Sequence, residues 1–252
     1  MKDFFVVIPA RFASERLPGK PLREIAGKPM LQHVYERAIE SGAAEVIIAT
    51  DDQRIVDVAS SFSAACCMTS AEHQSGTDRL AEIAQVKKWT DDQIVVNLQG
   101  DEPLMPPELI RQCAALLADG SADIATLASP ILSAEDFLNP NVVKVVVDND
   151  DNALIFSRAA IPYSRTASTE QLARQTALQH HGIYAYKNAV LQKIVAAPQS
   201  PLEKCERLEQ LRALSLGMTI KVGRPTTRPG RGVDTQADLA EVEKEFGERK
   251  QG

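Results

Sequence analysis

Short apolar runs of strand length alternate with helix-spaced apolar residues through the first half of this chain. Between the first two runs, Pro29 stands where a helix would start and Gly42 where it would stop. A chain that alternates strand and helix in this way forms a parallel sheet, because each helix crosses over to bring the next strand alongside. We therefore predict an α/β fold with a mostly parallel, twisted sheet and helices on both faces. Its predicted strands are Phe4–Ile8, Glu45–Thr50, Gln93–Leu98 and Asp123–Ser129.

The alternation changes after about residue 130. Val142–Val147 and Ala153–Phe156 flank a run of Asp and Asn that is typical of a hairpin turn. Residues 163–180 are polar and irregular, and Gly182–Tyr186 is predicted as another strand. With 252 residues and 44% hydrophobic content, the chain can bury one sizeable core. We therefore expect a single domain over residues 1–252, with a small β-rich sub-region inserted at about 130–190.

The C-terminal part returns to regular helix and strand patterns. One amphipathic helix is predicted from Ser200 to Gly217, because Pro201 suits its first turn and Glu203 completes a capping box with Ser200. A strand at 219–222 and a final helix, begun at 235 by a threonine cap, are predicted to follow.

Charge and composition exclude several classes of function. A formal net charge of -6 and a pI near 5.4 argue against a general nucleic-acid binder or a binder of anionic membranes. The sequence has no signal-peptide pattern at its start and no apolar run near the ~20 residues of a membrane span. We therefore expect a soluble cytoplasmic protein with no nucleic-acid or membrane partner, and we expect its cysteines to be free thiols.

The loop after the first predicted strand is locally basic. It carries Arg11, Arg16 and Lys20 against one acid, Glu15, within a chain that is acidic overall. Open α/β sheets bind ligands where their strands end, so this loop suits an anion such as a nucleoside triphosphate. It is not a P-loop, because Pro21 follows Gly19-Lys20 in place of Ser or Thr, and it has too few glycines for a dinucleotide fingerprint.

Two aspartates are candidates for a metal site near this loop. Asp101 lies just past the strand at 93–98, where a carboxylate can hold the Mg²⁺ that accompanies a polyphosphate. Mg²⁺ commonly takes one or two carboxylates, and Asp234, directly before the last helix, is the best second candidate by position. The alternative is a capping or turn role, which is weaker for Asp101 than for Asp234.

The segment from His73 to Arg79 precedes a predicted helix. Ser75 and Gly76 could bring backbone amides to a base or a ribose there. Simple capping of the helix by Ser75 explains the same residues equally well.

Taken together, these segments make the chain similar to the CMP-Kdo synthetases, which are 3-deoxy-manno-octulosonate (Kdo) cytidylyltransferases. The opening loop and the segment around Asp101 would by themselves indicate only the wider group of nucleotidyltransferases. The resemblance extends over nearly the whole chain, through Ile8-Pro-Ala-Arg-Phe-Ala-Ser-Glu-Arg-Leu-Pro-Gly-Lys-Pro-Leu22, Ala49-Thr-Asp-Asp52, His73-Gln-Ser-Gly-Thr-Asp-Arg79, Val96-Asn-Leu-Gln-Gly-Asp-Glu-Pro103, Asn139-Pro-Asn-Val-Val-Lys144, Phe156-Ser-Arg158, Gly182-Ile-Tyr184, Pro201-Leu-Glu203, Leu208-Glu-Gln-Leu-Arg212 and Gly232-Val-Asp-Thr235.

The resemblance implies a Rossmann-like nucleotide-diphospho-sugar transferase fold whose inserted region serves dimerisation and sugar binding. It also implies a reaction that transfers CMP from CTP to the anomeric hydroxyl of Kdo, releasing pyrophosphate, for lipopolysaccharide biosynthesis. Mg²⁺ would be required, and the protein would be a homodimer with its interface in residues 130–165.

The resemblance also implies roles for individual residues. Arg11, Lys20 and Asp101 would be catalytic, and Asp101 and Asp234 would bind the metal. CTP would be bound by Ala10, Arg11, Ser14, Lys20, Thr50, Ser75, Gly76, Arg79 and Gln99. Kdo would be bound by Gln99, Arg158, His180, Tyr184, Glu209 and Gln210.

One departure from the family pattern bears on the sugar. Gln179-His-His-Gly182 replaces an Arg-His-Leu/Ile-Gly pattern, so His181 stands where an aliphatic residue is usual. Two alternatives stay open at this point: a cytidylyltransferase for another sugar acid, such as a sialic acid or an amino-substituted Kdo, and a non-catalytic nucleotide-binding protein that keeps the fold.

Overall fold

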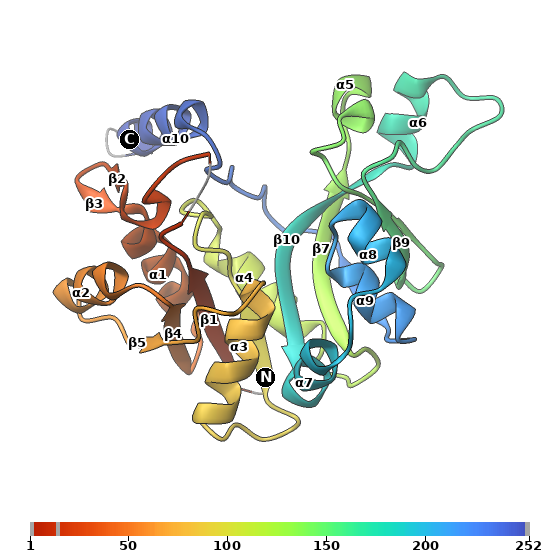
Figure 1. Ribbon diagram of the computed structural model, residues 1–252. Helices are drawn as coiled ribbons and strands as arrows, with labels where there is room; N and C mark the ends of the chain where they lie inside the picture. The colour runs from red at the N-terminus through yellow and green to blue at the C-terminus, as the bar shows by residue number, and fades with distance from the viewer. Residues whose placement is uncertain (1–2, 14–15, 250–252) are drawn as a thin grey trace.

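The computed structural model describes residues 3–13 and 16–249, and most of its strands form one mixed sheet (Figure 1). The main path through this sheet runs β11-β7-β10-β6-β1-β4-β5, while β8 pairs with β10 and β9 pairs with β8. A separate small sheet contains β2 and β3. The strands are β1 (Phe4–Ala10), β2 (Glu24–Ile25), β3 (Lys28–Pro29), β4 (Glu45–Thr50), β5 (Cys66–Met68), β6 (Ile94–Asn97), β7 (Ile124–Pro130), β8 (Lys144–Val147), β9 (Ala153–Ser157), β10 (Leu178–Lys187) and β11 (Ile220–Gly223).

The half of the sheet built from the N-terminal strands is parallel. β1 pairs in parallel with β4 on one side and with β6 on the other, and β4 pairs in parallel with β5. Val6, Val7 and Ile8 of β1 are fully buried, as expected for a central strand that is covered on both faces. The α/β fold and the strands predicted at 4–8, 45–50, 93–98 and 123–129 are confirmed.

Helices cover both faces of this sheet. α1, α2 and α4 pack on the face that includes Val6, whereas α3, α7 and the 208–213 segment pack on the face that includes Val7. The alternation of neighbouring strand residues between two cores is the direct result of the two-residue repeat of a strand. The helices are η1 (Lys20–Leu22), α1 (Met30–Glu40), α2 (Gln53–Ser61), α3 (Gly76–Val86), α4 (Pro107–Ala115), α5 (Ala134–Leu138), α6 (Thr169–Gln175), α7 (Asn188–Ala196), α8 (Pro201–Glu206), α9 (Gln210–Ser215) and α10 (Gln236–Arg249).

The strand β10 lies in the middle of the sheet, between β6 and β7, and is antiparallel to both. The sequence pattern places this segment inside the inserted sub-region at 130–190, whereas in the structure it links the parallel half of the sheet to the β7–β11 pair. The hairpin predicted at 142–156 is confirmed as β8 and β9, and it joins the sheet through the start of β10. The apolar pattern of a strand shows that it is buried but does not identify its neighbours.

The single helix predicted from Ser200 to Gly217 is wrong. The structure has two short helices, α8 and α9, separated by Arg207 in the left-handed conformation with φ of 53°. The capping box of Ser200 with Glu203 forms as predicted. The break turns α9 back toward α8, so that Arg212 forms a buried ion pair with Glu203 at 2.5 Å. This ion pair joins two separate helices, so the amphipathic pattern of the 200–217 segment did not indicate it.

Three further helices, the short α5 among them, were not predicted from the sequence. The polar segment at 163–180 contains α6, which begins at a capping box between Ser168 and Gln171. The helix α7 follows β10 directly and buries Val190, Leu191 and Ile194. Within residues 3–13 and 16–249, the structure contains no helix that is both long and apolar enough to cross a membrane.

Candidate active site

Two carboxylates from distant parts of the chain converge on one lysine. The Nζ atom of Lys20 lies 2.5 Å from Oδ2 of Asp101 and 2.9 Å from Oδ1 of Asp234. Lys20 follows β1 and Asp101 follows β6, so both lie beyond the C-terminal ends of adjacent parallel strands. The structure therefore brings together the three residues that the sequence proposed for triphosphate and metal binding.

A small apolar core holds these three residues in place. Leu17, Leu104 and Val233, close in sequence to Lys20, Asp101 and Asp234 respectively, are buried together with residues of α10. Close backbone packing adds to this core. Val233 N donates to Asp101 O at 2.8 Å. A Cβ atom at Gly230 would lie 2.4 Å from the backbone oxygen of Leu104, so only glycine fits there.

The electrostatics of this cluster keep Lys20 charged. Burial alone would lower the pKa of Lys20, but Asp101 and Asp234 outweigh burial and raise its pKa above the ordinary value. The neighbouring Glu102 behaves differently. Burial, reinforced by the charges of Asp101 and Asp234, raises the pKa of Glu102 to about 8. Glu102 is therefore mostly protonated at neutral pH and adds little negative charge to the two aspartates.

The two aspartates fit a magnesium ion. Both carboxylates lie within hydrogen-bonding distance of the same ammonium, so they already face one point at which a cation is stable. Residues 3–13 and 16–249 hold no group of three or more His, Cys, Asp and Glu placed to bind a metal. Two carboxylates completed by substrate oxygens and water are the usual protein contribution to a Mg²⁺ site.

The rest of the first loop is only partly described. Arg16, to which the sequence assigned no role, pairs with Oδ1 of Asp234 at 2.9 Å. Arg11 is exposed, and Ser14 lies outside the described residues. Ala10 and Thr50 are paired at the ends of β1 and β4, so both lie at the same edge of the sheet.

The start of α3 approaches the end of β1. Ser75 caps this helix, because its hydroxyl accepts from Asp78 N at 3.2 Å while the Asp78 carboxylate accepts from Ser75 N at 2.9 Å. The capping interpretation of Ser75 is thus confirmed, and it leaves open a further contact with a ligand. A Cβ atom at Gly76 would lie 3.0 Å from Pro9, so glycine allows α3 to begin close against β1.

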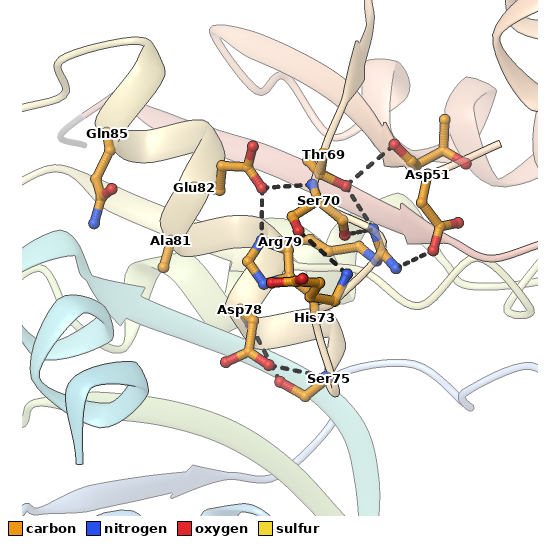
Figure 2. A network of polar contacts seen from close by, with 12 residues as sticks. Asp51, Thr69, Ser70, His73, Ser75, Asp78, Arg79, Ala81, Glu82 and Gln85 are labelled. Atoms are coloured by element: carbon orange, nitrogen blue, oxygen red, sulfur yellow. Dashed lines mark hydrogen bonds and ion pairs between the residues drawn. The ribbon is translucent and has the colours of Figure 1, made fainter. Parts of the chain in front are cut away.

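Arg79 lies beneath the loop that leads into α3 (Figure 2). Its side chain is fully buried, and it donates to Asp51, to the Thr69 hydroxyl and to the Ser70 carbonyl. Figure 2 also shows Glu82, which accepts from Ser70 N and lies 2.6 Å from His73. The structure thus gives Arg79 a supporting role below the loop, and direct contact between Arg79 and cytidine stays a prediction.

Replacing Arg79 by methionine should lower the free energy of unfolding by about 3–5 kcal/mol, because it leaves the Asp51 carboxylate without its buried partner. Urea unfolding measures this difference. Arg174→Met is the matched control, since it breaks an exposed pair with Glu170 and should cost less than about 1 kcal/mol. Equal losses in the two variants would contradict a structural role for Arg79.

The residues proposed for the sugar gather around β10. His180 and Tyr184 lie on this strand with their rings 5.1 Å apart, and Gln99 approaches the same strand at Gly182. Glu209 and Gln210 line a small cavity together with Tyr184. Arg158 is set apart from them, because its guanidinium donates to the carbonyls of Glu206 and Pro140.

A wider cleft lies between the loop before α3 and the α8–α9 segment. Its volume is about 610 Å³, and Glu209 lies on its wall. The cleft thus borders both the predicted cytidine loop and the predicted sugar site. Its lining residues are Gln74, Ser75, Asp78, Gln199, Glu203, Lys204, Arg207, Glu209 and Arg212.

The two adjacent histidines of β10 should make the fold sensitive to acid. Burial lowers the pKa of His180 to about 3 and that of His181 to about 4. Both are therefore neutral when folded, whereas in the unfolded chain they protonate near pH ~6.5, so stability is lost as the pH falls below that value. The free energy of unfolding should therefore fall between pH 7 and pH 5, and His181→Leu should make this fall smaller by roughly 2 kcal/mol. Urea unfolding at both pH values measures the difference. An unchanged difference would contradict the burial of a neutral His181.

Several residues of this site carried no signal in the sequence. The contact between Thr77 and Glu209, at 2.6 Å, joins positions far apart in the chain. The ion pair between Arg79 and Asp51, at 2.6 Å, likewise joins two separate segments. A glutamate beside a metal-site aspartate could have drawn attention to Glu102, but its raised pKa depends on burial and on its nearness to Asp101 and Asp234 in the fold.

Comparison with known proteins connects this geometry to a family. A family model described as Cytidylyltransferase matches residues 5–220. The chain is 54% identical over 244 residues to a 3-deoxy-manno-octulosonate cytidylyltransferase of Vibrio vulnificus strain YJ016, with 96% of this chain and 97% of that protein covered. A protein of the same description from Yersinia enterocolitica serotype O:8 is 53% identical, with 95% and 97% covered.

A solved structure agrees with these sequence relationships. It is described as CMP:2-keto-3-deoxy-manno-octonic acid synthetase complexed with CTP, and it aligns with a TM-score of 0.90. The two chains are 43% identical, and the alignment covers 98% of this chain and 100% of the other.

Proposed function

We infer the activity of this chain from its family, because it belongs to the cytidylyltransferases and, among them, to the 3-deoxy-manno-octulosonate cytidylyltransferases. The chain transfers CMP from CTP to the anomeric hydroxyl of Kdo and yields CMP-Kdo and pyrophosphate. The structural observation that best supports this reaction is the convergence of Lys20, Asp101 and Asp234 beyond the ends of the parallel strands. One cation between two carboxylates suits chemistry on a triphosphate.

The reaction is a displacement at the α-phosphorus of CTP. The anomeric oxygen of Kdo forms a bond to this phosphorus while the bond to the oxygen that bridges the α- and β-phosphates breaks. Pyrophosphate leaves with that oxygen, and the anomeric proton passes to solvent. Lys20 and Arg11 would stabilise the negative charge on the α-phosphate and the departing pyrophosphate, and fixed charges of this kind supply most of the catalysis in phosphoryl-group chemistry.

We propose that Asp101 and Asp234 hold Mg²⁺, which when bound neutralises charge on the polyphosphate. The support is the position of both carboxylates around one ammonium and the low number of protein ligands that Mg²⁺ needs. Lys20 pairs with both aspartates, and its raised pKa keeps it cationic for contact with the negatively charged nucleotide.

The sugar acid would bind between β10 and the α8–α9 segment. Gln99, His180 and Tyr184 lie on one side of this region, and Glu209 and Gln210 lie on the other. Arg158 donates hydrogen bonds to the carbonyls of Glu206 and Pro140, so its guanidinium would reach the sugar carboxylate only after these hydrogen bonds break. Neutral His180 can donate one hydrogen bond or accept one, as recognition of a sugar hydroxyl requires.

The inserted region supports the proposal of a homodimer. Leu132, Leu138, Leu154 and Tyr163 are exposed large apolar side chains of this region, and Tyr163 is 87% exposed. Exposed apolar residues concentrated in one region are typical of an interaction surface. We further propose that the enzyme acts in the cytoplasm and that its product serves lipopolysaccharide biosynthesis.

Pyrophosphate release from CTP and Mg²⁺ in the presence of Kdo tests the activity. A parallel series with a sialic acid, with an amino-substituted Kdo and with no acid measures the choice of sugar. We expect Kdo to give the highest kcat/KM. A higher value with another acid would replace Kdo as the substrate, and tight CTP binding without pyrophosphate from any acid would favour a non-catalytic nucleotide-binding protein.

A further inference from the structure

The carboxylate of Glu209 is held by the first turn of α3, which belongs to the predicted nucleotide loop. Thr77 donates its hydroxyl proton to Oε2 of Glu209 at 2.6 Å, and Thr77 is only 2% exposed. A residue directly beside the predicted cytidine contact Gly76 therefore sets the orientation of a predicted sugar contact.

The other oxygen of Glu209 is buried and makes no hydrogen bond to any group that the structure describes. Arg212 lies nearest among the cations, at 3.9 Å, which is beyond hydrogen-bonding distance. The hydroxyl of Tyr184 is also buried and has no hydrogen-bond partner among residues 3–13 and 16–249, and both residues line the same small cavity. Buried polar atoms without partners are rare in folded proteins, and at an active site they indicate groups kept for a ligand.

We propose that Thr77 is a positioning residue that couples the two substrate sites. Its hydroxyl fixes the Glu209 carboxylate so that Oε1 faces the sugar acid as a hydrogen-bond acceptor. This role rests on the proposed function of the site. Because Thr77 lies in the first turn of α3, between Gly76 and Arg79, the loop that receives the nucleotide also determines whether Glu209 is correctly oriented.

Thr77→Val tests this role, since valine keeps the shape of threonine and replaces the hydroxyl with a methyl group that cannot form a hydrogen bond. We expect the KM for Kdo to rise about tenfold, while kcat and the Kd for CTP measured without Kdo stay within about twofold. Thr77→Ser should restore the wild-type KM, because serine keeps the donor. Ser41→Ala removes a buried hydroxyl that bonds only within the α1 end, so it controls for a general loss of stability.

A double-mutant cycle with Glu209→Ala separates positioning from a structural effect. If Thr77 acts through Glu209, Thr77→Val should leave the KM for Kdo unchanged in the Glu209→Ala background. Thr77→Ala serves the same comparisons if the valine variant does not fold.

The outcomes distinguish this proposal from the proposed function. A wild-type protein that releases no pyrophosphate with Kdo contradicts the proposed function itself. An active wild type with an unchanged KM for Kdo in Thr77→Val overturns the positioning role. An equal rise in the Kd for CTP overturns it as well, because the hydroxyl would then support only the nucleotide loop.

Discussion

Replacing Asp101 by asparagine should lower kcat by roughly a hundred- to a thousandfold, the size of effect expected when one fixed electrostatic contact to the reacting group is lost. Asparagine keeps the shape of the side chain but removes the charge that Mg²⁺ requires. The fold should survive, because the apolar core of Leu17, Leu104 and Val233 holds the surrounding backbone. Steady-state pyrophosphate release measures kcat, and thermal unfolding measures stability.

Asp119→Asn is the matched control for this experiment. Asp119 is an exposed acid whose partners lie in its own turn, so its replacement should leave turnover near that of the wild type. A folded Asp101→Asn protein with near-normal pyrophosphate release would remove Asp101 from the metal site.

Lys20→Met should also reduce kcat by about a hundredfold or more, because it removes a fixed cation from the triphosphate site. A second readout does not depend on activity. Lys20 pairs with both Asp101 and Asp234, so methionine removes the cation that the two carboxylates share and leaves Asp234 with the exposed Arg16. The variant should unfold at a lower temperature than the wild type without metal, and added Mg²⁺ should raise its Tm more than it raises that of the wild type.

Lys193→Met controls for loss of a lysine, since Lys193 is exposed on α7 away from the aspartates. Turnover like that of the wild type would exclude Lys20 from catalysis. A Mg²⁺ response no larger than that of the wild type would show that the ammonium and the metal do not compete for the same carboxylates.

The sequence predicted the parallel half of the fold well because each of its elements depends on local chemistry. Buried runs such as Glu45–Thr50 and helix boundaries such as Pro29 and Gly42 appear in the structure as predicted. The antiparallel position of β10 and the break at Arg207 were missed. Both depend on contacts with other segments. Arginine does not favour the left-handed conformation, so the residue type at position 207 does not indicate a helix break.

The candidate site shows the same division. Lys20 and Asp101 stood out because each follows a predicted strand, and Asp234 was proposed by its position before the last helix. No pattern linked Thr77 to Glu209 or Arg79 to Asp51, because a hydrogen bond between distant residues leaves no periodicity in the chain. The family resemblance supplied the sugar-site residues, which residue patterns alone had not assigned to a sugar.

By itself, the sequence determined the class of fold, the basic loop after β1 and the acids suited to a metal, because these depend on residue types and local spacing. Only the tertiary structure decided that Lys20 lies between Asp101 and Asp234, that Glu102 is mostly protonated at neutral pH and that Glu209 is oriented by Thr77. The physical reason is that burial and convergence are properties of the packed chain. Close packing of the 230–234 segment against 101–104 places the two acids within reach of one cation.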